Sequence, residues 1–210
     1  MKITLISDTH GRHRSLSPPL GDMIIHAGDI SGVGQEEEIA DFFDWYSGLD
    51  FTHKILIAGN HDFFFEKAGV ERLKTVIPKD VIYLEDNGIN IEGVNIWGSP
   101  ITPWFNNWAF NRQRGKEIKE HWKLIPKDTD ILITHGPPRG VLDRNARGIP
   151  AGCDDLLKII QKLKPKYHIF GHIHEGHGSL TKGQTTFVNA SVLDERYELV
   201  NGPVSVEWKN

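Results

Sequence analysis

The sequence has a single cysteine and no long hydrophobic run, and both shortages exclude whole classes of protein. Cys153 is the one cysteine among 210 residues, so the chain can form neither an intrachain disulfide nor a cysteine-rich zinc site. No apolar run approaches the roughly 18 residues of a membrane span, and the apolar start of the chain is too short for a signal peptide. We therefore expect a cytoplasmic protein with no membrane partner.

The sequence also has no excess of positive charge. The chain carries 24 Lys and Arg residues against 28 Asp and Glu residues, which gives a formal net charge of −4. Surfaces that hold nucleic acid are usually basic, so this balance argues against a stable nucleic-acid partner. The length suits one domain with a substantial core, and we expect residues 1–210 to form it, as a monomer or a small homo-oligomer.

Short apolar runs alternate with amphipathic stretches along the chain. Runs rich in Ile and Leu predict buried strands at Ile3–Ile6, Asp22–His26, Lys54–Ile57, Asp130–Thr134 and Tyr167–Phe170. Apolar residues at helical spacing predict helices at Glu36–Tyr46, Val70–Val76, Arg112–Trp122 and Asp154–Leu163. Val81–Leu84 and Ile89–Trp97 are typical of a hairpin, and Gly178–Trp208 is typical of antiparallel strands. This order favours an α/β layered domain with a partly mixed sheet.

Polar residues directly follow each of the five predicted strands. The segments are Ser7-Asp8-Thr9-His10, His26-Ala27-Gly28-Asp29, Gly59-Asn60-His61-Asp62, Thr134-His135-Gly136 and Gly171-His172-Ile173-His174. Loops at the carboxyl ends of strands in an open α/β sheet line one crevice, so these residues should meet at one edge. Both members of an Asp-x-His or His-x-His pair can face one site, because alternate side chains of an extended segment point the same way.

The donor types at this edge indicate a metal centre. Histidine occurs 11 times and is the commonest metal ligand in proteins. Carboxylate and amide oxygens combined with imidazole nitrogens suit Mn, Fe, Zn, Ni or Co better than Ca or Mg. Seven such ligands exceed the number that one tetrahedral ion takes, and they suit two ions that share a bridging carboxylate. We expect two divalent transition-metal ions, with Mn²⁺ favoured.

Each of three further groups of residues allows two interpretations. Arg12 and His13 are candidate substrate-binding residues beside Asn60 and His61, although a solvated loop would explain them equally well. An aromatic cluster could stack on a base or belong to the core, and it comprises Trp104, Phe105, Trp108 and Phe110. An arginine-rich loop could guide an anion or simply be solvated, and it contains Arg139, Arg144 and Arg147.

These motifs resemble those of the calcineurin-like metallophosphoesterase superfamily. Its blocks Asp-x-His, Gly-Asp, Gly-Asn-His-Asp/Glu, His beside Gly, and Gly-His-x-His all occur in order between Asp8 and His174. Further segments are similar to its metallophosphoesterase-domain (MPPED-like) branch, namely Gly98–Asn106, Thr134–Pro138, Phe170–Gly176 and Asn189–Ser191. The resemblance implies a four-layer α-β-β-α sandwich of two mixed sheets, forming a single metallophosphoesterase domain.

The resemblance also implies a role for each matching residue. One ion would be held by Asp8, His10 and His174, the other by Asn60, His135 and His172, with Asp29 bridging both. His61 would face the substrate as a general acid without binding metal, and Asp62 would orient it. Asp62 stands where many members of the family have Glu.

The expected reaction is hydrolysis of a phosphodiester. A hydroxide between the two ions would attack phosphorus in line with the leaving oxygen, which His61 would protonate. The substrate would be a small phosphoester or nucleotide, with 2′,3′- or 3′,5′-cyclic nucleotides as candidates. A phosphomonoesterase and a non-catalytic metal-binding scaffold of the same fold stay open as alternatives.

Overall fold

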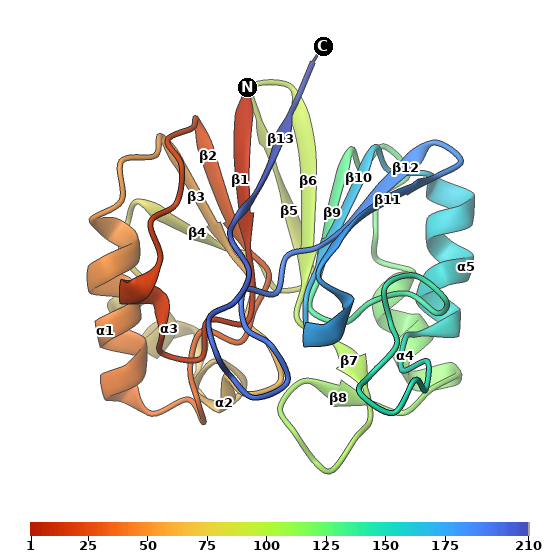
Figure 1. Ribbon diagram of the computed structural model, residues 1–210, viewed down its shortest axis with the longest axis horizontal. Coiled ribbons are helices and arrows are strands. Elements are labelled where there is room, and N and C mark those ends of the chain that lie inside the picture. The colour runs from red at the N-terminus through yellow and green to blue at the C-terminus, as the bar shows by residue number, and fades with distance from the viewer. Residues whose placement is uncertain (210) are drawn as a thin grey trace.

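Two β-sheets pack face to face, and helices cover their outer faces (Figure 1). The computed structural model describes residues 1–209. The first sheet has the order β13 (Val204–Glu207), β1 (Lys2–Ile6), β2 (Met23–His26), β3 (His53–Leu56) and β4 (Val81–Tyr83). Strands β1 to β4 are parallel and β13 is antiparallel to β1, so this sheet is mixed.

The second sheet is mixed as well. Its order is β11 (Gly178–Lys182), β12 (Thr185–Asn189), β10 (Tyr167–Phe170), β9 (Ile131–Thr134), β6 (Val94–Ser99) and β5 (Asn87–Ile91). The four central strands are parallel, and the edge strands β11 and β5 are antiparallel to their neighbours. A small pair, β7 (Thr102–Pro103) and β8 (Asn111–Arg112), lies beyond the end of β6 (Figure 1).

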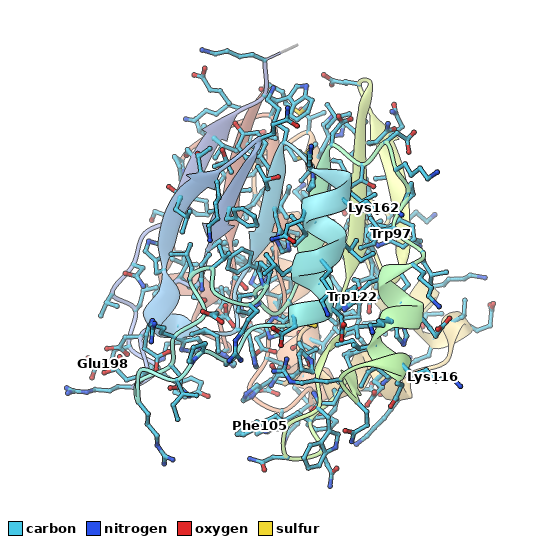
Figure 2. The ribbon with its side chains drawn as sticks, turned by 90° about the vertical axis from the view of Figure 1, so that its right-hand side faces the viewer. Trp97, Phe105, Lys116, Trp122, Lys162 and Glu198 are labelled. Atoms are coloured by element: carbon cyan, nitrogen blue, oxygen red, sulfur yellow. The ribbon has the colours of Figure 1, made fainter. Side chains whose placement is uncertain are left out.

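Helices form the two outer layers, which confirms the predicted four-layer sandwich. The first sheet is covered by α1 (Glu36–Ser47), α2 (Phe63–Lys67) and α3 (Val70–Val76), and the second by α4 (Lys116–Trp122) and α5 (Asp154–Leu163) (Figure 1). Trp122 is buried where α4 faces α5 (Figure 2). Among residues 1–209, the structure has no helix with the length and hydrophobicity required to span a membrane.

The alternation of side chains along each strand explains the two apolar layers. In β2, Met23 and Ile25 belong to the cluster between the sheets, while Ile24 points to the opposite face and joins the cluster that contains Phe42 and Tyr46 of α1. The Tyr46 hydroxyl donates to the Ile24 carbonyl at 3.2 Å, which ties α1 to the sheet. Burial on both faces accounts for the continuous apolar strands seen in the sequence.

The five predicted strands are confirmed to within one residue at each end, but one pairing prediction is wrong. β4 does not form a hairpin with the run that follows it, because it pairs with β3 in the first sheet. The hairpin instead joins β5 to β6 through Glu92 and Gly93, whose positive φ angles of 51° and 85° suit a two-residue turn. Local pattern identifies strands but leaves their partners undecided.

Two other expectations need correction. The C-terminal segment contains the antiparallel pair β11 and β12, as expected, but β13 does not join it, because β13 lies in the first sheet and pairs antiparallel with β1. The helix predicted from Arg112 begins at Lys116, since Asn111 and Arg112 pair with β7. The first difference arises from pairing between distant parts of the chain, and the second from the nearby pairing of Thr102 with Asn111; periodicity does not encode either partner.

Candidate metal centre

The carboxyl ends of β1, β2 and β3 in one sheet and of β9 and β10 in the other meet at the lower edge in Figure 1. The loops that follow these strands carry every predicted ligand. Several ligands have left-handed backbone conformations, with φ of 56° at Asp8, 57° at Asp29 and 68° at His172. Such conformations are costly for residues other than glycine and gather at functional sites, where the surrounding structure holds them.

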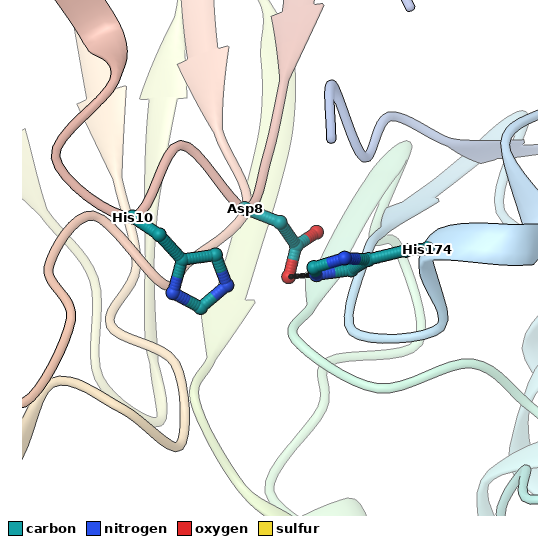
Figure 3. A group of neighbouring side chains, drawn as sticks. All are labelled: Asp8, His10 and His174. Carbon is teal, nitrogen blue, oxygen red and sulfur yellow. Dashed lines mark ion pairs between the residues drawn. The ribbon is translucent and has the colours of Figure 1, made fainter. Parts of the chain in front are cut away.

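One cluster joins Asp8, His10 and His174, whose potential ligand atoms all lie within 4.8 Å of one another (Figure 3). His174 Nε2 lies 3.6 Å from Asp8 Oδ1. His10 Nε2 is buried and has no hydrogen-bond partner among residues 1–209. A buried nitrogen without a partner is costly, and a divalent ion between these side chains would satisfy it.

A second cluster joins Asp29, His135 and His172, again within 4.8 Å. His135 Nε2 lies 2.9 Å from Asn60 Oδ1 and 3.2 Å from Asp29 Oδ2. The same Asp29 oxygen is 3.6 Å from His10 Nε2. Asp29 therefore lies between the two clusters, where a bridging carboxylate would have to be.

Backbone carbonyls fix the orientation of four imidazoles at this site. The Nδ1 contacts are His10 to Ser31 O at 3.1 Å, His61 to Gly32 O at 2.7 Å, His135 to Ala27 O at 2.9 Å and His174 to Asp194 O at 2.8 Å. Because a carbonyl oxygen only accepts, Nδ1 must be the donor in each pair. Nε2 of the neutral ring is left free, to bind metal in the three predicted ligands and to face the cleft in His61. This second contact to a carbonyl is usual for histidines that ligate metals.

The buried carboxylates hold protons on two of the imidazoles. Burial alone would lower the pKa of His174, but its contact with Asp8 outweighs burial and raises the pKa to about 9. Burial opposes charge on His135 too, and Asp29 raises its pKa to about 9. His172 has no such contact, and burial lowers its pKa to about 4. The protons on His135 and His174 thus occupy positions that divalent ions would take.

The absence of side chains at two glycines lets the loops approach the carboxylates. A Cβ at Gly59 would collide with the Asp29 carboxylate, and a Cβ at Gly171 would collide with the Asp8 carboxylate. Both glycines belong to the motifs noted in the sequence, Gly59-Asn60-His61-Asp62 and Gly171-His172-Ile173-His174. Close approach of the backbone, rather than a turn, is the reason for glycine at these positions.

Ser191 is a part of the site that sequence reasoning missed. Its hydroxyl donates to Asp8 Oδ2 at 2.7 Å. The neighbouring Asn189 accepts the Ser191 N–H at 3.1 Å and donates to the Ile173 carbonyl at 2.8 Å, which anchors the loop between His172 and His174. The segment Asn189–Ser191 stood out in the sequence, and its place directly after a strand was the signal that it belongs here.

His61 lies at the open side of the centre and is held firmly. Its ring stacks on Trp108 at a centroid distance of 4.2 Å and meets the His10 ring edge-on at 4.6 Å. Its backbone N–H donates to Asp29 Oδ1 at 2.8 Å. The potential ligand atoms of His61, His10 and Asp29 lie within 4.8 Å of one another, so His61 is close enough to act on a group bound there.

Asp62 does not orient His61, which differs from the expected role. Its carboxylate accepts the Ser31 hydroxyl at 2.7 Å and the backbone N–H groups of Ile30, Ser31 and Gly59. Burial and the nearby Asp29 raise the pKa of Asp62 to about 6. Asp62 therefore joins the loops after β2 and β3, and the Gly32 carbonyl takes the orienting role.

Neither of the two residues expected to touch substrate beside the first loop reaches the site. The His13 ring is fully buried near Phe42 and Trp45, at 5.4 and 5.1 Å, and its Nε2 lies 3.0 Å from Asp41. Arg12 is exposed and does not line the cleft above the metal centre. The chain enters a 3₁₀ turn at His13, which directs these side chains away from the metal ligands.

A cleft of about 500 Å³ opens above the two clusters. Trp104, Phe105 and Trp108, from the segment between β7 and β8, line it, and Phe105 lies at the lower edge in Figure 2. The fourth aromatic residue of the expected cluster, Phe110, is in the core instead. The rim also carries charged and phenolic side chains, which are Arg114, Glu175, Glu195 and Tyr197.

The three arginines of the arginine-rich loop, Arg139, Arg144 and Arg147, do not line the cleft, although Asn145 of the same loop does. Arg139 donates to the Pro150 carbonyl at 2.8 Å and Arg144 to the Gly148 carbonyl at 2.7 Å, so both stabilise their own loop. Arg114 is the one Lys or Arg that lines the cleft among residues 1–209, and it donates to the carbonyls of Ala151 and Gly152.

Comparisons with known proteins agree with this geometry. The human Metallophosphoesterase domain-containing protein 1 is 40% identical over 98% of this chain and 70% of its own length. A UPF0046 protein of Caenorhabditis elegans is 37% identical over 97% of this chain and 74% of its own length. The solved structure of Phosphopantetheinyl Hydrolase from Mycobacterium tuberculosis has the same fold, with a TM-score of 0.64 and 16% identity over 93% of this chain and 90% of that one.

A sequence model of one family covers most of the chain and all of the clustered residues. The calcineurin-like phosphoesterase model matches residues 1–176, which include every ligand from Asp8 to His174. Members of that family are metal-dependent phosphoesterases, and the imidazole and carboxylate clusters found here fit divalent ions. The chain belongs to the calcineurin-like phosphoesterase family.

Proposed function

We propose that this protein is a phosphodiesterase with two divalent ions, of which Mn²⁺ is the favoured metal. Asp8, His10 and His174 hold one ion, and Asn60, His135 and His172 hold the other. The observation that carries the proposal is the position of Asp29, whose Oδ2 lies 3.6 Å from His10 Nε2 and 3.2 Å from His135 Nε2. One carboxylate within reach of both clusters is what a bridged pair of ions requires.

The chemistry divides between the ions and the chain. Two divalent ions, when bound, supply the Lewis acidity that activates water near neutral pH and offsets the charge of the phosphoryl group. The chain supplies the proton for the leaving oxygen. His61 Nδ1 donates to the Gly32 carbonyl, so the second proton of the imidazolium is on Nε2 and can pass to the leaving alkoxide. Stacking on Trp108 keeps the ring in place during this transfer.

The charges around the cleft support a diester rather than a monoester substrate. Glu175 and Glu195 line the rim, and Arg114 is the only Lys or Arg among the described lining residues. A phosphodiester carries one negative charge, whereas a monoester carries nearly two at neutral pH, so acidic side chains at the rim disfavour the monoester more strongly. The size of the cleft admits aryl diesters and cyclic nucleotides.

Steady-state kinetics of the Mn²⁺-loaded protein test the proposal. We expect a higher kcat/KM for bis-aryl diesters or for 2′,3′- and 3′,5′-cyclic nucleotides than for the corresponding monoesters. His61→Ala should lower kcat by about 10²–10⁴-fold for diesters with poor leaving groups, with a much smaller loss when the leaving group needs no proton. His53→Ala removes a histidine near Glu92, outside the cleft, and should match the wild type.

Metal content separates the remaining possibilities. The His61→Ala variant should retain its ions, since His61 is not among the proposed ligands. A wild-type protein that binds two ions but hydrolyses no phosphoester would be a scaffold of this fold. A protein that prefers monoesters would be a phosphomonoesterase, and either result would contradict the proposal.

A further inference from the structure

Tyr197 lies over one half of the metal centre, on a loop that no sequence motif marks. Its ring centroid is 4.9 Å from that of His10, 5.3 Å from that of His174 and 6.5 Å from that of His61. The residue lines the cleft and remains 42% exposed. The loop between β12 and β13 reaches the same lower edge as the other site loops (Figure 1).

The loop that carries Tyr197 is attached to a metal ligand. The Asp194 carbonyl accepts His174 Nδ1 at 2.8 Å and also accepts the Tyr197 N–H at 3.0 Å. The Asp194 carboxylate accepts the N–H groups of Arg196 and Glu198, both at 2.9 Å. One carbonyl therefore sets the position of His174 and of Tyr197 together, so the ring has a defined place relative to the first cluster.

The backbone at Tyr197 is in an unfavourable conformation. Its φ is 60°, in the left-handed region that a bulky side chain rarely adopts. A glycine would relieve this cost but would leave the His10 and His174 rings uncovered. Such conformations persist at functional sites, where the position of the side chain has a role, and here that side chain is a phenol.

The phenol is free to bind a ligand. Among residues 1–209, no hydrogen-bond partner of the Tyr197 hydroxyl is present, and the side chain lines the cleft. A phenol donates a hydrogen bond without adding charge, and a bond to an anionic phosphoryl oxygen is stronger than one between neutral groups. The rim near it carries Glu195 and Glu175, so a neutral donor is the group on this side that an anion can approach.

We propose that Tyr197 is a substrate-contacting residue, whose hydroxyl donates to a non-bridging phosphoryl oxygen of the bound diester. The ring also covers the side of the cleft above His10 and His174. The ester groups are thereby directed towards Trp104 and Phe105, whose side chains are 48% and 60% exposed. This inference rests on the proposed function and adds the residue that orients the phosphoryl group.

The decisive variant is Tyr197→Phe, which retains the ring and the backbone and removes only the hydroxyl. In the Mn²⁺-loaded protein, we expect kcat/KM for a bis-aryl diester and the affinity for inorganic phosphate, measured by calorimetry, each to fall about tenfold. Metal content, measured by elemental analysis, should equal that of the wild type. Tyr167→Phe is the matched control, because its hydroxyl donates to the Glu207 carbonyl outside the cleft.

Each outcome of this experiment has a definite meaning. Wild-type phosphate affinity and kinetics in Tyr197→Phe would overturn the role of the hydroxyl while leaving the phosphodiesterase proposal intact. Weaker phosphate binding in a protein that hydrolyses no phosphoester would support Tyr197 as an anion contact and contradict the proposed function. Loss of metal from Tyr197→Phe would show that the residue acts on His174 rather than on substrate, and would overturn the proposal.

Discussion

The floor of the cleft, formed by the predicted metal ligands, differs from its rim in burial and in how its side chains are held. Asp8, Asp29 and His135 are between 0% and 2% exposed, whereas Phe105 and Tyr197 are exposed by 60% and 42%. Floor residues lie in loops that directly follow sheet strands, and the floor histidines His10, His135 and His174 contact backbone carbonyls. The aromatic rim residues come instead from the β7–β8 and β12–β13 loops. We therefore propose that the floor supplies the chemistry and that the rim selects the substrate.

The largest expected effect comes from removing the carboxylate shared by both clusters. Asp29→Ala should lower the metal content from about two ions per chain to fewer than one, and kcat/KM by about 10³-fold or more. Elemental analysis and diester kinetics measure both. Asp44→Ala removes a carboxylate whose side chain is 76% exposed, and it should change neither quantity. Retention of two ions by Asp29→Ala would contradict the bridging role.

We also expect the floor residues, unlike the rim residues, to make protein stability and metal affinity depend on pH. The pKa values of His135 and His174 are raised from 6.5 to about 9 in the folded protein. Their ion pairs therefore stabilise the metal-free protein fully below about pH 6.5, and this stabilisation disappears as the pH rises through about 9. Metal binding must displace the same protons, so metal affinity should rise over that range.

Two measurements check this dependence. Thermal unfolding of the metal-free protein should show a falling Tm between pH 6.5 and 9, and calorimetry in buffers of different ionisation enthalpy should show proton release on metal binding. A Tm that rises with pH, or metal binding without proton release, would mean that these imidazoles are already neutral.

A smaller effect is expected from the residue that positions a floor carboxylate. Ser191→Ala removes the 2.7 Å hydrogen bond to Asp8 and should weaken metal affinity by about 10–100-fold. Ser99→Ala is a matched control, because it removes a 2.6 Å hydrogen bond from another buried serine to Asp86, which is not part of the metal centre. Equal metal affinity in the two variants would show that Ser191 does not support metal binding.

The smallest effect is expected at the rim. Glu195→Gln removes one negative charge beside the cleft and should raise kcat/KM for aryl monoesters a few-fold relative to diesters, as expected for one exposed charge. Metal content should not change. Glu198→Gln alters the same loop outside the cleft lining and serves as the control. The proposed division between floor and rim would fail if Glu195→Gln changed metal binding instead of substrate preference.

Sequence reasoning succeeded where a residue type and its place after a strand were enough. The Asp, Asn and His residues after β1, β2, β3, β9 and β10 were assigned to one edge, and the structure brings them together there. The same reasoning was wrong for His13, which also follows a predicted strand but has its side chain in the core. The difference is a single turn of 3₁₀ helix, which spacing along the chain does not reveal.

Tyr197 and Ser191 show a second limit. Both are more than 180 positions from their nearest partners in the first loop, Asp8 and His10, so the sequence does not show which residues they contact. Likewise, Asp62 has the residue type expected of an orienter, yet its carboxylate turns to Ser31 and the Gly32 carbonyl contacts His61 instead. Every residue has a backbone carbonyl, so the sequence does not show which carbonyl will orient a given side chain.

The amino-acid sequence by itself determined the layered α/β class, the main strands and the donor atoms of the candidate metal centre, because side-chain alternation and residue chemistry are local properties. Tertiary structure alone decided which strands share a sheet, which carbonyls orient the imidazoles, and that Tyr197 covers His10 and His174. These depend on contacts between distant parts of the chain, whose geometry is settled only when the two sheets pack together.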